Sequence, residues 1–156
     1  MDLIRPVIYY LQRHNSVFLM SLLSRKGLLA ITAVLDVALH ARGRPVSAKE
    51  LAARHALPPR HLEPVLQALV RVGILKGVRG PRGGYELGRE QRRITAEDIL
   101  RAAQSLDEDS NPSVPDSPLL SSVVLPAMVQ AEGAFSAALA RINVEDLALR
   151  AQTASS

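Results

Sequence analysis

The chain has no cysteine and no tryptophan, and its aromatic residues are three tyrosines and two phenylalanines. Without cysteine it can form no disulfide, thiolate metal site or cysteine-ligated iron–sulfur cluster, and nothing argues for an oxidising compartment. No stretch approaches about 18 uninterrupted apolar residues, because polar residues such as Arg13 and His14 break the apolar N-terminal stretch. These absences predict a cytoplasmic chain without a membrane partner.

Charge is distributed unevenly along the 156 residues, a length that suits one core with an appendage. Residues 20–104 hold 15 Lys or Arg and 7 Asp or Glu, whereas residues 105–156 hold 2 and 7. The net charge of +4 therefore combines a basic front with an acidic back. This polarity is typical of a module that presents one face to a polyanion.

The segment VRGPRGGYEL, residues 78–87, has the pattern of a β-hairpin with a basic tip. A loop rich in glycine and proline separates two short runs of strand-forming residues, which predicts a turn with positive φ angles. Arg79 and Arg82 lie in that loop. A protruding basic hairpin suits a nucleic-acid groove or a phosphate backbone.

Helical periodicity starts after Ser24, a candidate N-cap, and continues to Gly43, a candidate stop. The expected buried stripe consists of six apolar residues: Leu28, Ile31, Val34, Leu35, Ala38 and Leu39. Arg25 and Lys26 fall in the first turn, where the helix dipole disfavours cations unless an anion lies close. They are candidate phosphate contacts, and two solvated charges are an equal alternative.

Two further helices follow, joined by a short turn. Ser47 and Glu50 form a capping box that opens a short helix ending near His55. A second helix starts near Pro59 and carries apolar residues on one side as far as Gly73. Two helices joined in this way are a helix-turn-helix pattern.

The hairpin follows these helices directly, and this order predicts a winged helix, a mainly α fold with a small β-hairpin wing. In such a domain the second helix enters the major groove of DNA, and the wing lies over the backbone or the minor groove. Arg60 and His61 then face base edges, and Gln67 faces phosphate. Pro64 predicts that the helix starts after Pro59 or bends.

The remaining chain divides around an acidic loop. Thr95 and Asp98 cap a helix that closes the domain, so we expect the DNA-binding domain to span residues 20–104. Residues 105–117 are acidic and rich in proline, which predicts a loop. Residues 1–19 form an N-terminal extension of unknown role.

Residues 118–156 are expected to form a dimerisation helix and a short last helix. Pro118 can open the long helix, behind Ser117 as its cap. Along it an apolar seam steps by 4, 3, 4, 3 and 4 residues, and Leu120 extends it: Val124, Met128, Ala131, Phe135, Ala138 and Ile142. Such a heptad seam calls for a partner helix, and folding back on the chain's own core is the alternative.

Two details complete the expected C-terminal part. Pro126 should kink the long helix. Asn143 with Asp146 should start the short last helix, and residues 151–156 should fray.

No enzyme class is favoured. The glycine-rich loop leads into a strand, whereas a phosphate-binding loop leads into a helix. Asp36 and His40 lie four residues apart and could share a metal, as could His55 and His61, but neither pair has a third ligand at a suitable spacing. We therefore predict no catalytic residue, no metal and no cofactor. A protein-interaction adaptor remains the alternative to a DNA-binding regulator.

The stretches LSRKGLLAITAVLDVAL, HLEPVLQALVRVGILKGVRGPRGGYEL and ITAEDILRA resemble a known family. They are similar to the bacterial winged-helix repressors that include IscR, NsrR and CymR, also called the Rrf-two family. The likeness covers residues 22–103 closely and the C-terminal helices loosely. It implies a homodimeric transcription regulator, expected to act as a repressor, with two DNA-binding domains on a palindromic operator.

The resemblance also implies site residues. The recognition helix begins around Pro58 and Pro59, and the side chains that would touch bases fall at Pro58, Arg60, His61 and Pro64, with Glu63 as the family's glutamate and Arg79 as its wing arginine. The expected DNA-binding set is Arg25, Lys26, Pro58, Pro59, Arg60, His61, Glu63, Gln67, Arg79, Gly80, Pro81, Arg82 and Tyr85.

Two departures from the family pattern matter. Better-known members have serine, tyrosine and glutamine types at several recognition positions, so their operator sequences do not transfer. Several members also hold an iron–sulfur cluster with three cysteines in the segment that matches residues 105–118, and this chain has none. The effector stays open: a small ligand, a protein partner or none.

Overall fold

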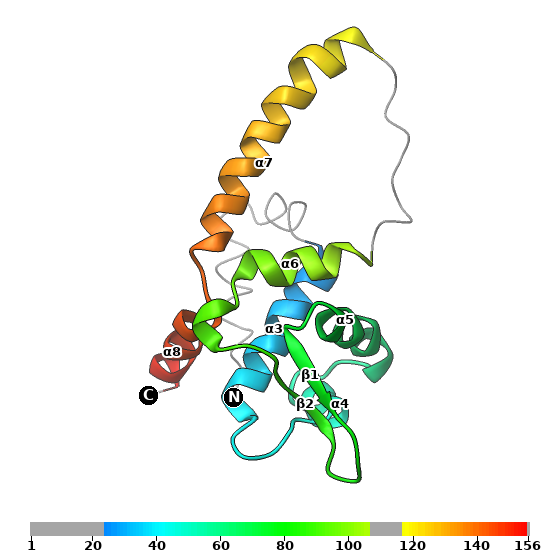
Figure 1. Cartoon of the computed structure of the whole chain (residues 1–156), viewed down its shortest axis with the longest axis vertical. Helices are drawn as coiled ribbons and strands as arrows, with labels where there is room; N and C mark the ends of the chain where they lie inside the picture. The colour runs from blue at the N-terminus through cyan, green and yellow to red at the C-terminus, as the bar shows by residue number, and fades with distance from the viewer. Residues whose placement is uncertain (1–23, 107–116, 156) are drawn as a thin grey trace.

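The structure is a computed structural model that describes residues 24–106 and 117–155. Its first part has the helix, helix, wing order of a winged helix-turn-helix, and its second part is a long helix that projects away (Figure 1). The elements are α3 (Arg25–His40), α4 (Ala48–Arg54), α5 (Pro59–Arg71), β1 (Leu75–Val78), β2 (Gly84–Leu87), the 3-10 turn η1 (Gln91–Arg93), α6 (Ala96–Gln104), the π-helical η3 (Leu120–Val124), α7 (Leu125–Ala140) and α8 (Val144–Ala154).

Helix α3 is the central element of the domain. The Ser24 side chain accepts a hydrogen bond from the Gly27 backbone N–H at 2.9 Å, which confirms the predicted cap. The helix ends at His40 and not at Gly43, because Ala41 already leaves the helical conformation. Helices α5, α6 and α8 and strand β2 all pack against it.

The buried face of α3 differs from the predicted stripe. Its fully buried apolar residues are Ala30, Ala33, Val34 and Val37, whereas five of the six predicted residues, all but Val34, are only half-buried. Because α5, α6, α8 and β2 all pack against α3, only small side chains fit where these elements approach it most closely. Gly27 is one such position, since an added Cβ would lie 2.6 Å from Leu100 Cδ2. Val34, Ile31 and Ala38 of the predicted stripe do face the core, but the prediction was wrong for its three leucines.

The helix-turn-helix has the predicted caps. Both halves of the Ser47 and Glu50 capping box are present at the start of α4. Helix α5 begins at Pro59 with Pro58 as its N-cap residue, so the late start considered for it is wrong. Pro64 lies inside α5 and has no N–H to donate to the Arg60 carbonyl.

The wing is a two-stranded antiparallel hairpin with a single-residue β-bridge, at Val46, beside it. Its register pairs Leu75 with Leu87 and Val78 with Gly84, as the sequence predicts for two short strands. Val46 exchanges two backbone hydrogen bonds with Tyr85, of 3.0 and 2.8 Å, so the connection after α3 continues the sheet. The wing is thereby tied to the segment that leads into α4.

Helix α8 returns to the winged-helix part. Asn143 caps it by accepting from the Asp146 backbone N–H at 2.9 Å, as predicted. The Ala96 N–H donates to the Ile142 carbonyl at 2.8 Å, and the Val144 N–H donates to the Ile94 carbonyl at 2.9 Å. Residues 151–154 are helical, so their predicted fraying was wrong.

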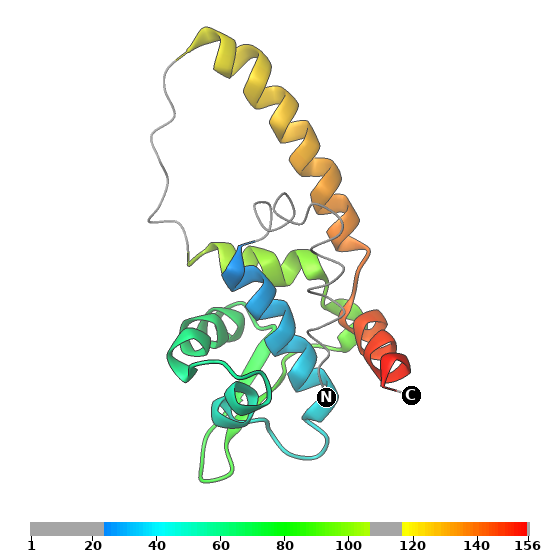
Figure 2. The same ribbon diagram turned by 180° about the vertical axis from the view of Figure 1, so that it is seen from behind.

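Helix α7 extends from this anchored end into solvent (Figures 1 and 2). Ahead of Pro126 the backbone widens into η3, where the Leu125 N–H bonds to the Leu120 carbonyl five residues back. Proline has no N–H to donate, and a local π-turn accommodates this loss. Pro126 therefore lies within one continuous helical run.

The apolar surface of this helix is not covered by the described residues. Residues 120–140 have a mean hydropathy of 1.4 with no buried residue, so by length and composition this helix could cross a membrane. The expected extension at residues 1–19 and most of the acidic loop lie outside the described residues, and the domain boundaries stay predictions.

Candidate nucleic-acid interface

Helix α5 exposes one face and buries the other. Leu62, Val65, Leu66, Ala68 and Leu69 are buried in the domain. The opposite face carries the predicted recognition residues, all of them exposed: Pro58, Pro59, Arg60, His61, Glu63, Pro64 and Gln67. The start of the helix is held by the bond from the His61 N–H to the Pro58 carbonyl, at 3.0 Å.

The wing tip presents a second exposed set. Gly80 has a φ of +120°, a conformation that suits glycine, and its carbonyl accepts from the Gly83 N–H at 2.9 Å. This turn leaves Arg79, Pro81 and Arg82 exposed. Among the described residues, neither arginine at the tip has an ion-pair partner, so both are available to an external anion.

Helix α5 and the wing lie side by side and enclose an open groove of about 430 Å³. Its walls are Gln67, Val70, Gly77, Val78, Arg79, Gly84 and Tyr85. Burial, and then the negative charge of Glu63, raise the pKa of Tyr85 above its ordinary value, so its hydroxyl stays a neutral donor at physiological pH. The structure thus brings Gln67, Arg79 and Tyr85 together at one groove, and Glu63 lies close enough to act on Tyr85.

Arg25 and Lys26 do not join this surface. They lie at the start of α3, beside the end of α6 and far from the wing tip in both views (Figures 1 and 2). The Lys26 ammonium donates to the Leu106 carbonyl at 3.2 Å. An intramolecular contact therefore accounts for Lys26, and the proposed interface below leaves both residues out.

The predicted dimer residues have mixed surroundings. Met128, Val124, Ala131 and Ala138 are exposed, and Leu120 and Phe135 are half-buried. Ile142 lies beyond the end of α7, and its carbonyl bonds to Ala96. The heptad step to Ile142 therefore leaves the helix, and this residue does not continue the seam.

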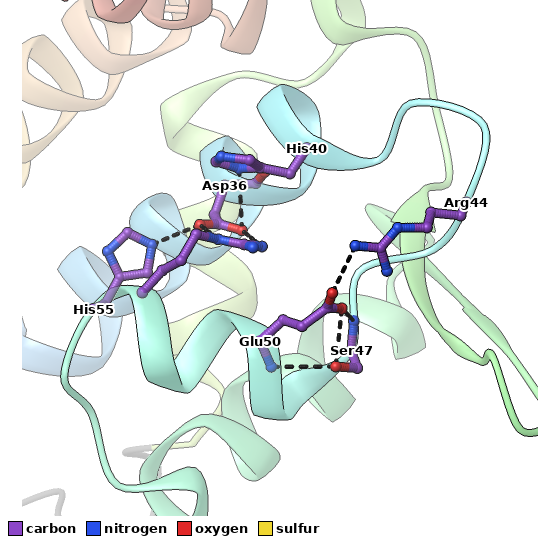
Figure 3. A network of polar contacts seen from close by, with 7 residues as sticks. Asp36, His40, Arg44, Ser47, Glu50 and His55 are labelled. Carbon is purple, nitrogen blue, oxygen red and sulfur yellow. Dashed lines mark hydrogen bonds and ion pairs between the residues drawn. The ribbon is translucent and has the colours of Figure 1, made fainter.

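A polar network between α3 and the end of α4 is the main feature that sequence reasoning missed (Figure 3). Asp36, 3% exposed, accepts from Arg54 Nε at 2.9 Å, from Arg54 Nη2 at 2.7 Å and from His55 Nε2 at 2.7 Å. Burial alone would raise the pKa of Asp36, but the hydrogen bonds from Arg54 and His55 hold it below its ordinary value. A lone aspartate in an apolar helix was the available signal, but its partners 18 and 19 residues later were not predictable from spacing.

The same network argues against a metal ion shared by Asp36 and His40, the pair considered from the sequence. The Arg54 guanidinium contacts both oxygens of Asp36, so a cation there would meet a positive charge. Within residues 24–106 and 117–155, no group of three His, Cys, Asp or Glu residues is placed to hold a metal ion.

Comparison with known proteins places this surface in a family. The family described as "Rrf2: Iron-dependent Transcriptional regulator" matches residues 23–150. The HTH-type transcriptional regulator IscR of Xenorhabdus nematophila is 40% identical over 86 residues, 54% of this chain and 52% of that protein. IscR of Vibrio cholerae is 37% identical over 86 residues, 54% of this chain and 50% of that protein. The chain spans about half the length of these curated relatives.

Two solved structures share the fold over more of the chain. The T. potens IscR structure has a TM-score of 0.68 at 30% identity and covers 86% of this chain and 90% of its own. The structure of CymR, the global cysteine regulator of B. subtilis, has a TM-score of 0.65 at 28% identity and covers 82% and 96%. The predicted winged-helix fold is confirmed.

The family description names iron, and the donor set of this chain can be compared with that. The sequence has no cysteine at any position, so no thiolate is available to an iron–sulfur cluster. The chain therefore does not fit a cysteine-ligated cluster.

The matched proteins are transcriptional regulators, which confirms the expectation that the chain is not an enzyme. The match extends over most of the sequence and includes the helix-turn-helix, the wing and the C-terminal helices. The chain belongs to the Rrf2 family of transcriptional regulators.

Proposed function

We propose that the protein binds double-stranded DNA sequence-specifically, as a homodimer on a palindromic operator, and represses transcription there. The observation that carries the proposal is the single surface formed by the exposed face of α5 and the basic wing tip, with Arg79 in the groove between them. Repression follows from occupancy, because a dimer bound over a promoter blocks the polymerase.

The two parts of this surface suit two neighbouring grooves of DNA. A recognition helix enters the major groove with its N-terminal residues at base edges. Arg60 is a bidentate donor suited to guanine, and Glu63 is an acceptor suited to the amino group of cytosine. Pro58 and Pro59 have no donor to offer and suit contact with thymine methyl groups.

The wing then reaches the backbone or the adjacent minor groove. Arg79 and Arg82 are exposed cations without intramolecular partners among the described residues, which is the state expected of phosphate contacts. The DNA backbone runs between the two grooves. Gln67 on α5 and the neutral Tyr85 hydroxyl on β2 line the groove between helix and wing, where they can contact that backbone.

Helix α7 supplies the dimer contact. Its first half carries bulky exposed side chains, among them Met128 at 58% and Val129 at 63% exposed, and its second half carries exposed alanines at 134, 137, 138 and 140. A monomer that exposed this apolar surface to water would be prone to aggregate. Pairing two copies buries it, and a two-fold dimer predicts an operator with two inverted half-sites.

A membrane span is the other reading of α7, since its length and composition allow one. Two observations favour the dimer. The Ser136 hydroxyl bonds to the Glu97 carboxylate on α6, so the second half of α7 is fixed to the domain. The match to the T. potens structure, at 86% of this chain, is longer than residues 24–106 alone allow. We place the protein in the cytoplasm, with its DNA.

Genome-wide footprinting of the protein in its own cells tests the proposal. We expect footprints at promoters, and duplexes made from them should bind the purified dimer at low salt with an affinity that falls steeply as salt rises. A dimer that binds none of the genomic duplexes at low salt would contradict the proposal and would favour the adaptor function.

A further inference from the structure

Asp36 lies inside the domain and yet is charged. Among the described residues it is the only buried polar or charged one, and its side chain is 1% exposed. A carboxylate in such a place is unfavourable unless it is paired and hydrogen-bonded. The side-chain hydrogen bonds that meet this condition come from Arg54 and His55, at the C-terminal end of another helix, α4.

Those partners are the last residue of α4 and the residue that follows it. Arg54 grips both carboxylate oxygens of Asp36, at 2.9 and 2.7 Å, and His55 Nε2 lies 2.7 Å from one of them. His40 approaches from the α3 side, with its Nδ1 at 3.5 Å from Asp36 Oδ1. The carboxylate therefore ties the C-terminal end of α4 to the central helix (Figure 3).

The turn into the recognition helix begins at this tie. Ala56 has a φ of +51° and is the only non-glycine residue with a positive φ in the described parts of the chain. That conformation is disfavoured for alanine, so the surroundings must hold it. His55 is fixed on one side of it, and on the other side the Leu57 N–H bonds to the Ala52 carbonyl at 3.0 Å.

The turn leads directly to the DNA-facing residues. Pro58 is the N-cap residue of α5, and Arg60 and His61 follow in its first turn. A change in the direction of residues 55–57 would therefore rotate the base-contacting end of α5 relative to the wing, which is held separately by the Val46 and Tyr85 bridge.

We propose that Asp36 is a positioning residue for DNA recognition: it holds Arg54 and His55, and through them the turn that aims the start of α5. The inference rests on the proposed function, because it concerns the same DNA surface. Asp36 itself touches no DNA. The network serves recognition more than stability, since well-packed apolar residues in place of a buried ion pair are often as stable or more stable.

Three variants separate positioning from stability. Asp36→Asn keeps the size of the side chain and removes the charge. The double variant Asp36→Leu with Arg54→Met replaces the pair by apolar groups and remains informative if the single variant folds poorly. Glu50→Gln is the matched control, because it weakens the Arg44 pair at the other end of α4, where Arg44 Nη2 lies 2.7 Å from Glu50 Oε1.

The first measurement uses the DNA-free protein. Amide exchange by NMR at Leu57 and His61 reports on the turn, because both N–H groups are hydrogen-bonded there. We expect on the order of tenfold faster exchange at these two amides in Asp36→Asn, with unchanged exchange in α6. Unchanged exchange at both amides would overturn the inference, and this result does not depend on DNA binding.

The second measurement compares two duplexes at one salt concentration: one that the wild type selects from a random-sequence pool, and a shuffled duplex of the same composition. We expect Asp36→Asn and the double variant to lose on the order of tenfold in the affinity ratio, with the shuffled duplex bound as before. The double variant should show the reduced affinity ratio even if its melting temperature equals that of the wild type. Glu50→Gln should show the wild-type affinity ratio.

Two outcomes of the second measurement decide against the account. If the double variant recovers the ratio together with its melting temperature, Asp36 is merely structural and the inference fails. If the wild type itself prefers no duplex, the proposed function fails, and the exchange rates alone then decide whether Asp36 holds the turn.

Discussion

Arg79 is the residue on which the proposed DNA contact depends most. It lies where the wing leaves β1, lines the groove beside α5 and is exposed. Its guanidinium can reach a phosphate or a base edge, and nothing in the described part of the chain pairs with it. In the proposed complex the wing arginine and the recognition helix would therefore contact adjacent parts of the DNA.

Replacing Arg79 by alanine should weaken binding to the selected duplex by about 1–3 kcal/mol, because a desolvated contact to DNA is lost. Fluorescence anisotropy over a series of salt concentrations measures both the affinity and its salt dependence. Lys76→Ala is the control, since Lys76 is an exposed cation of the same hairpin outside the groove. Equal losses for the two variants would contradict a specific role for Arg79.

Asp36 should make stability depend on acid. Its pKa in the folded protein lies below the ordinary 3.8, so the carboxylate binds protons less readily when folded than when unfolded. Its contribution is therefore complete above the ordinary pKa and is lost as pH falls through the folded value. Urea unfolding between about pH 2 and pH 6 should show a fall in the free energy of unfolding that is smaller in Asp36→Asn.

This acid dependence involves the groups that face Asp36. Three basic side chains face the carboxylate: Arg54, which stays charged throughout, and the imidazoles of His55 and His40. Identical slopes of unfolding free energy against pH in the wild type and Asp36→Asn would contradict the assigned pairing.

Residue-level prediction succeeded where a side chain acts alone. The winged-helix order predicts that Arg60 and His61 face outward, the glycine-rich hairpin loop predicts the same for Arg79, and the structure exposes all three. The Asp36 and Arg54 pair was not predicted, because a contact between two helices depends on their packing and not on spacing. For the same reason the contact of Lys26 with Leu106 was not predicted.

At the scale of the element, the wing depends on close backbone approach. A Cβ added to Gly84 would lie 2.3 Å from the Val46 carbonyl oxygen, which belongs to the bridge with Tyr85. Backbone at this distance cannot yield without breaking the bridge. The bridge between Val46 and the wing therefore requires glycine at this position.

Gly84→Ala should destabilise the fold by about 1–3 kcal/mol, the usual cost of forcing a group into filled space. Gly77→Ala, in the same hairpin, should cost less, because nothing lies within 4 Å of an added Cβ there. Thermal unfolding followed by circular dichroism compares the two variants. A Gly84→Ala protein as stable as Gly77→Ala would refute the close approach.

Helix α7 should lose its partner when its seam is charged. Met128→Asp places a carboxylate in the proposed interface and should convert the dimer to monomers, as measured by sedimentation. Val129→Asp is the control, since Val129 is equally exposed but lies off the heptad seam. If both variants remain dimeric, the seam is wrong, and if the wild type sediments with membranes and both variants do not, α7 spans a membrane.

Elements with local signals were predicted well. The capping boxes at Ser47 and Thr95 and the glycine-rich turn marked helix and hairpin boundaries that the structure has. The buried face of α3 was predicted wrongly, because small residues, and not leucines, occupy the close helix crossings. The π-turn before Pro126 and the return of α8 onto α3 depend on tertiary contacts, and no local pattern indicates them.

At the scale of the whole molecule, the proposed dimer requires each DNA-binding domain to be held firmly to its own helix α7. Helix α8 bonds to the segment before α6, and Ser136 on α7 bonds to Glu97 on α6. The end of α7 is thus held firmly to the winged-helix part. In the proposed complex the basic half of the sequence would face DNA and the acidic half would form the dimer part, which would keep the phosphate backbone on one side.

A rigid connection between head and axis predicts a fixed operator geometry. Two heads related by a two-fold axis can reach major grooves on one side of the duplex only at centre-to-centre spacings near one or more helical turns, about 10 base pairs each. Insertion of about half a turn between the half-sites should therefore weaken binding far more than insertion of a full turn. Equal affinity for both spacings in an anisotropy titration would contradict a rigid dimer.

The most direct measurement of the central claim is selection of duplexes by the purified protein from a random-sequence pool, followed by sequencing. The account predicts enrichment of one motif made of two inverted half-sites at a fixed spacing, bound by two copies of the chain. A single half-site without its inverted repeat, or no enrichment at all, would contradict the claim that this protein recognises DNA as a dimer.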